Sequence, residues 1–69
     1  MPEYYVNKKA QSNGDHEVHQ ATGCPTPAEL HNRKPLGWHQ SCQSAVREAK
    51  KTYAKADGCA NCCPDCHTR

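Results

Sequence analysis

Apolar and polar positions alternate in two short stretches near the start of the chain. Residues 3–9 place two tyrosines and a valine ahead of polar residues, a composition typical of a strand. Residues 16–20 alternate around a central valine, and residues 11–14 between the two stretches have the polar and glycine content of a turn. Residues 36–39 show weaker strand character. The pattern predicts a small antiparallel sheet of about three strands.

The apolar spacing changes to a helical period in the C-terminal half. Ser41 is a suitable N-cap, and from there to Ala56 the chain contains neither proline nor glycine, whereas Asp57 and Gly58 form a stop signal. At about 100° per residue, one helix face collects Cys42, Ala45, Val46, Ala49, Tyr53 and Ala56. We therefore expect an α+β fold with one long C-terminal helix, closed at its end by a cysteine knuckle.

Composition indicates that this fold needs help beyond its apolar core. The chain has 69 residues without phenylalanine, and we expect one domain over residues 1–69. A domain of about 60 residues buries only about 60% of the surface that its unfolded chain exposes. Domains of this size commonly add a metal ion or disulfides, and six cysteines and five histidines are available here.

No stretch resembles a signal peptide or the roughly 20 apolar residues of a membrane span. We therefore expect a cytoplasmic protein without a membrane partner. In that compartment thiols stay reduced, and clustered cysteines favour metal binding over disulfides. The formal net charge of +2 points to no particular partner.

The strongest chemical signal is the motif from Cys59 to Cys62. Two residues between thiolates allow a tight knuckle that aims both sulfurs at one ion, although CxxC also occurs in redox sites and disulfides. His19 and Cys24 supply a second local pair upstream. Together they predict one structural Zn²⁺ on three cysteines and one histidine, the alternative being that His19 is an exposed histidine on an edge strand.

Four further groups have no place in that set. Cys42 lies on the apolar helix face, and Cys63, Cys66 and His67 follow the knuckle. A tail folded back along the helix would allow a second metal site on these four residues, or a disulfide from Cys42 to Cys63 or Cys66. In the third alternative, Cys42 is a small buried apolar residue beside a loose thiol tail.

Several of these residues occur in an order that resembles a known family. The matching positions are Tyr5-Val6-Asn7, Val18-His19, Cys24, Asn32-Arg33, Ser41, Ala45, Cys59, Cys62 and Pro64. They are similar to the Ada-type metal-binding module, the zinc domain of a bacterial DNA-repair protein, and the chain also resembles short cysteine-rich bacterial proteins. In the Ada-type module one zinc cysteine accepts a methyl group from DNA phosphate. His19 occupies the matching position and has no thiolate to alkylate, so the resemblance implies the zinc fold without that repair activity.

The expected function is accordingly a non-enzymatic zinc-binding module that presents a surface to an unidentified macromolecule, protein or nucleic acid. One alternative is a thiol-redox or metal-handling protein that uses the CxxCCxxCH tail. Another is a nucleic-acid-binding module with a basic helix face. That face would consist of Arg47, Lys50, Lys51 and Lys55. A run of charge on a helix is more often a solvated face.

Overall fold

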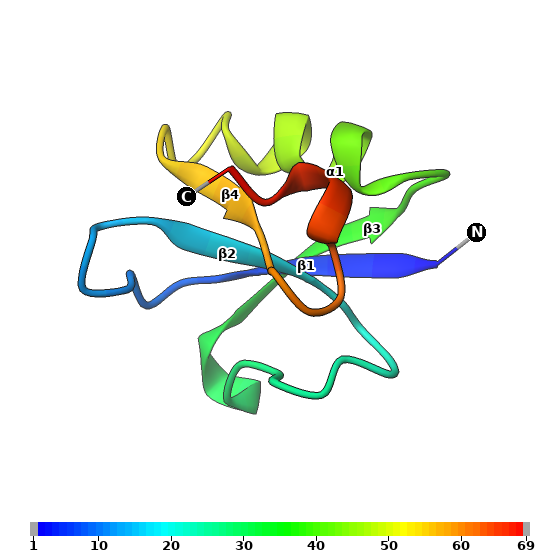
Figure 1. Ribbon diagram of the computed structural model, residues 1–69, viewed down its shortest axis with the longest axis horizontal. Helices are drawn as coiled ribbons and strands as arrows, with labels where there is room; N and C mark the ends of the chain where they lie inside the picture. Colours follow the sequence, from blue (N-terminus) through cyan, green and yellow to red (C-terminus); the bar gives the residue numbers. More distant parts are fainter. Residues whose placement is uncertain (1, 69) are drawn as a thin grey trace.

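The computed structural model describes residues 2–68 and consists of a four-stranded mixed sheet with one short helix (Figure 1). The strands are β1 (Glu3–Asn7), β2 (His16–Gln20), β3 (Arg33–Trp38) and β4 (Ala56–Gly58). Helix α1 spans Cys42–Ala49, and two 3-10 turns, η1 and η2, span Leu30–Asn32 and Pro64–Cys66. The strand order in the sheet is β3-β1-β2-β4.

The expected pairing of the first two stretches is present as an antiparallel hairpin of β1 and β2. Tyr5 lies opposite His19, and Val6 lies opposite Val18. The turn between them uses Gly14 at a φ of 89°, a left-handed conformation that glycine adopts without strain. Strand β3 pairs antiparallel with the other edge of β1, which places β1 in the interior of the sheet.

Strand β4 makes the sheet mixed, because it runs parallel to β2. His16 pairs with Ala56 and Val18 with Gly58, and the backbone N–H of Cys59 continues the ladder to the Val18 carbonyl at 2.9 Å. Parallel neighbours require a long connection, usually one that contains a helix. Here β3 and α1 both lie within it, so α1 crosses one face of the sheet before the chain returns as β4.

The predictions of one long C-terminal helix and of a purely antiparallel sheet of about three strands are wrong, although the α+β class is right. Helix α1 has 8 residues and ends at Ala49. The N–H groups of Thr52 and Tyr53 both donate to the Ala49 carbonyl in the turns that follow. Pairing with β2 overrides the helical propensity of residues 50–56, because it satisfies backbone groups and buries all three residues of β4.

Among the described residues, no helix has the length and apolar character that crossing a membrane requires.

The two faces of the sheet are covered differently, as Figure 1 shows with α1 on one side and the segment after β2 on the other. Tyr4, Val6 and Val18 face α1 and pack in one core with its alanines. The alternate side chains of Tyr5 and His19 are also buried, so they lie on the opposite face. The long loop from residue 21 to residue 29 covers that face.

The C-terminal turns pack tightly onto β4 at Gly58. A Cβ atom added there would lie 2.6 Å from Cys66 Cβ and 2.7 Å from the Cys63 carbonyl oxygen. One of these neighbours is backbone, so the clash has no side-chain rotation to relieve it. The close approach of η2 to the sheet therefore requires glycine at this position.

We expect Gly58→Ala to lower the free energy of unfolding by about 1–3 kcal/mol, the usual range for overpacking a core. Urea unfolding followed by circular dichroism measures the change. Ala60→Ser is the matched control, because Ala60 is exposed two residues later. Equal unfolding free energies for the two variants would contradict the packing described here.

Candidate metal centre

Four side chains from distant parts of the sequence converge beside the end of β2. They are His19 on β2, Cys24 on the following loop, and Cys59 and Cys62 just after β4. Their ligand atoms all lie within 4.8 Å of one another. The parallel register explains the convergence, because the pairing of Val18 with Gly58 puts the next residues, His19 and Cys59, side by side. The four groups lie close enough together to bind a metal ion.

The spacing of the donor atoms fits a tetrahedral site. With Zn–S bonds of about 2.3 Å and Zn–N bonds of about 2.0 Å, a regular tetrahedron has S–S edges of about 3.8 Å and N–S edges of about 3.5 Å. The Sγ atoms of Cys24 and Cys59 are 3.8 Å apart. His19 Nδ1 lies 3.4 Å from Cys24 Sγ and 3.7 Å from Cys62 Sγ. This donor set is compatible with zinc, whereas the geometry alone specifies only a small tetrahedral cation with affinity for sulfur.

The imidazole of His19 is held with Nδ1 toward the sulfurs. Its other nitrogen, Nε2, lies 3.5 Å from a carboxylate oxygen of Glu17. The ring stacks on Tyr5 with centroids 5.2 Å apart. Burial lowers the pKa of His19 and outweighs the opposing effect of Glu17, which favours the neutral ring that a metal requires. A carboxylate behind a ligating histidine typically fixes the tautomer that binds the metal.

Tyr5 also anchors the loop that carries Cys24. Its hydroxyl oxygen accepts a 3.0 Å hydrogen bond from the backbone N–H of Ala28. The guanidinium of Arg33 lies 4.6 Å from the centre of the Tyr5 ring, and Arg33 Nε donates to the Ala28 carbonyl at 2.9 Å. These contacts attach the loop to β1 and β3, so the position of Cys24 depends on the sheet beneath it.

The knuckle sulfurs are placed among hydrogen-bond donors. The N–H of Gln20 points at Cys62 Sγ at 3.4 Å, and the Thr26 hydroxyl lies 3.7 Å from Cys59 Sγ. Burial raises the pKa of the Cys62 thiol. Burial acts the same way on Cys59, but hydrogen bonds from the backbone of Cys62 and Asn61 and from the Thr26 hydroxyl outweigh it, so the pKa of Cys59 lies below its ordinary value. These hydrogen bonds favour the thiolate form of Cys59, which is the form that binds a cation.

The remaining cysteines and His67 are placed apart from this cluster. Cys42 and Cys66 form a disulfide with Cα atoms 6.3 Å apart, which ties α1 to η2. Cys63 is buried in the core against the helix. His67 Nδ1 lies 3.1 Å from the Gly58 carbonyl oxygen and 3.6 Å from the Asp57 carboxylate. Within residues 2–68 these four side chains form no second metal cluster, because the disulfide occupies two of the sulfurs.

The four basic residues do not form the expected stripe on one helix face. Because α1 ends at Ala49, only Arg47 lies within it, and Lys50 is its C-cap. The Lys51 ammonium pairs with Glu48 at 3.1 Å, and Lys55 Nζ donates to the Asn13 carbonyl at 3.2 Å. The continuous helical face on which the nucleic-acid reading depended is therefore absent from the described residues.

Sequence reasoning missed the residues that support the ligands. Glu17 precedes His19 by two positions on a strand, so the period of two could have placed both on one face. Tyr5 and Thr26 carried no comparable signal, because their contacts with the site depend on pairing across the sheet and on the path of the loop.

No protein-family model, curated protein or solved structure matches this chain. The resemblance to the Ada-type module is thus not supported by these comparisons, and neither is a bacterial origin. The His/Cys cluster itself stands on its geometry.

We expect Tyr5→Phe to lower the free energy of unfolding by about 1–3 kcal/mol, because the buried N–H of Ala28 loses its acceptor. Zinc affinity should fall with it, since the loop carrying Cys24 loses an anchor. Chelator competition and urea unfolding measure the two effects. Tyr53→Phe is the control, because its ring stacks on His16 away from the cluster. Equal behaviour of the two variants would show that the hydroxyl has no positioning role.

Proposed function

We propose that this chain is a non-enzymatic zinc-binding module in which one Zn²⁺ on His19, Cys24, Cys59 and Cys62 holds the fold together. The observation that carries the proposal is the convergence of four donor groups at tetrahedral spacing. Four protein ligands leave no position for water or substrate, which is the pattern of structural rather than catalytic zinc. His19 and Cys59 are each 1% exposed, whereas Cys24 and Cys62 are half-buried.

The energetics support a structural role. Apart from Tyr4, Val6 and Val18, the buried core against the helix consists of alanines and cysteines. Zinc binding to comparable sites is worth about 10–16 kcal/mol, as large as the whole stability of a typical domain, which is about 5–15 kcal/mol. The ion would join β2, the following loop and the segment after β4.

We further propose that the module presents a surface to another macromolecule. Strand β3 forms an edge of the sheet, and Trp38 at its end is 63% exposed. Tryptophan is enriched among the residues that dominate protein–protein binding energy. The partner contacted by this surface is proposed to be a protein, since the basic helix face expected for nucleic acid is absent from the described residues.

Native protein should contain about one zinc per chain, and a strong chelator should unfold it. Loss of the ion removes the links between β2, the following loop and the segment after β4. The small apolar core does not hold these segments together by itself. Elemental analysis and the dispersion of amide signals in NMR spectra, before and after chelation, measure both effects. Chelated protein that keeps its native dispersion would exclude a structural ion.

His19→Ala should weaken zinc binding by at least tenfold, since it removes one of four ligands. His19→Cys should retain zinc, because it converts the site to the four-cysteine set that zinc also accepts. His31→Ala is the control, because His31 is exposed and pairs only with Glu29 among the groups described. Competition with a chromogenic chelator measures the three affinities, and equal loss in His19→Ala and His31→Ala would remove His19 from the ligand set.

A further inference from the structure

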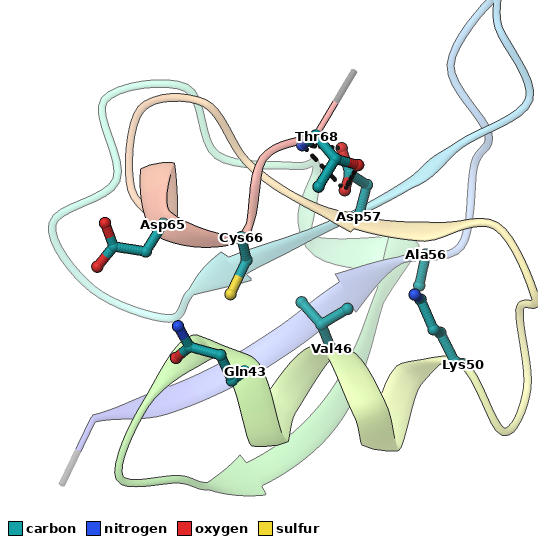
Figure 2. Close-up of a pocket in the computed structure, with 8 residues that line it drawn as sticks. All are labelled: Gln43, Val46, Lys50, Ala56, Asp57, Asp65, Cys66 and Thr68. Carbon is teal, nitrogen blue, oxygen red and sulfur yellow. Dashed lines mark hydrogen bonds between the residues drawn. The ribbon is translucent and has the colours of Figure 1, made fainter.

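The Cys42–Cys66 disulfide borders a cavity between α1 and the C-terminal turns. The cavity has a volume of about 230 Å³, and Figure 2 shows the Cys66 sulfur turned into it, toward the side chains of the helix. The lining residues from α1 and its C-cap are Gln43, Val46 and Lys50. Sites for drug-sized ligands usually occupy about 300–1,000 Å³, so this cavity suits a smaller molecule.

We propose that Cys66 is a site of thiol–disulfide exchange, at which a low-molecular-weight thiol enters this cavity and opens the Cys42–Cys66 bond. The exchange reaction itself uses none of the four metal ligands. It takes place between Cys42 and Cys66, which lie outside the proposed zinc site. It concerns one face of the protein, where the helix meets the tail.

The reaction balances with the incoming thiol as the only reductant. Its thiolate attacks Cys66 Sγ, forming a mixed disulfide with Cys66 while the bond to Cys42 breaks and the electron pair leaves on Cys42 Sγ. A second molecule of the thiol then attacks the mixed disulfide. The products are the oxidised small-molecule disulfide and two protein thiols.

Two features direct the attack to Cys66 rather than Cys42. Cys66 is half-buried and lines this cavity, whereas Cys42 is buried, with 8% of its surface exposed, and lines a second pocket of about 250 Å³. The direction of bond breaking also favours Cys42 as the leaving group, because it is the first residue of α1 and a thiolate is stabilised at a helix N-terminus.

The charges beside the cavity set no requirement on the charge of the thiol. Asp57 accepts hydrogen bonds from Thr68, at 3.1 Å from the backbone N–H and 2.8 Å from the hydroxyl (Figure 2), and it also lies 3.6 Å from His67 Nδ1. Figure 2 shows the Asp65 carboxylate turned away from the Cys66 sulfur, and Lys50 adds a basic residue to the lining. The proposal therefore concerns small thiols as a class.

Opening the bond should also loosen the metal centre, a consequence that rests on the proposed function. Backbone hydrogen bonds link Cys66 N–H to the Cys63 carbonyl at 3.0 Å and Cys63 N–H to the Cys59 carbonyl at 2.8 Å. The disulfide therefore fastens to α1 a run of turns that begins at a metal ligand. Reduction frees the far end of that run.

The first experiment treats zinc-loaded, oxidised protein with cysteamine, traps the products with N-ethylmaleimide and maps them by mass spectrometry. We expect the cysteamine adduct on Cys66 and the maleimide on Cys42. Neither label should exceed trace levels on Cys63 or on the metal ligands. Adducts on Cys42, or equal amounts on Cys42 and Cys66, would overturn the proposed direction. Labelling of Cys24, Cys59 and Cys62 as well would count against the zinc site. The conclusion that the thiol attacks Cys66 would not be affected.

Zinc transfer to a chromogenic chelator tests the consequence for the metal. Cysteamine should accelerate transfer from wild-type protein at least fivefold more than from Cys42→Ser, which has no disulfide to open and so controls for direct competition by the thiol. Equal acceleration in both proteins would show that opening the disulfide does not affect zinc release, and it would overturn this part of the inference.

Discussion

The parallel pairing of β4 with β2 is the contact on which the rest of the molecule depends. It places Cys59 directly beside His19, and Gly58 of the same strand is the position against which the C-terminal turns pack. Without this pairing the knuckle would have no histidine near it, and the tail would have no sheet to rest on. A short strand of low intrinsic β-propensity thus positions both the cysteine knuckle and the C-terminal turns.

The six cysteines divide into three groups that lie on different sides of the sheet or within the core. Three join His19 on the side of the sheet covered by the long loop, two connect α1 to η2 on the helix side, and Cys63 fills the core between them. The disulfide and the proposed metal ion together would compensate for a core built largely of small residues. A disulfide closing a loop of this size is worth about 3 kcal/mol, and a zinc ion considerably more, so the metal is the main stabilising element in this proposal.

The same arrangement separates protected sulfurs from exchangeable ones. The knuckle sulfurs receive hydrogen bonds from the backbone and from Thr26, which suits thiolates held by a cation. Burial raises the pKa of the Cys63 thiol, which disfavours its reactive thiolate form. Cys66 borders an open cavity and lies outside the metal cluster, which is why the proposed exchange is assigned to it.

The sequence by itself determined the local features. The β1–β2 hairpin followed from alternation around Val18 and a glycine turn, and the knuckle followed from the spacing of Cys59 and Cys62. Grouping His19 and Cys24 with that knuckle was a hypothesis about chemistry, since spacing along the chain does not specify which distant pairs meet. Only the tertiary structure decided the end of α1 at Ala49, the β4 strand, the Cys42–Cys66 pairing and the positions of Tyr5 and Thr26 around the site. These features arise from hydrogen bonds and packing between segments far apart in the chain, which outweigh the helical periodicity that residues 50–56 show locally.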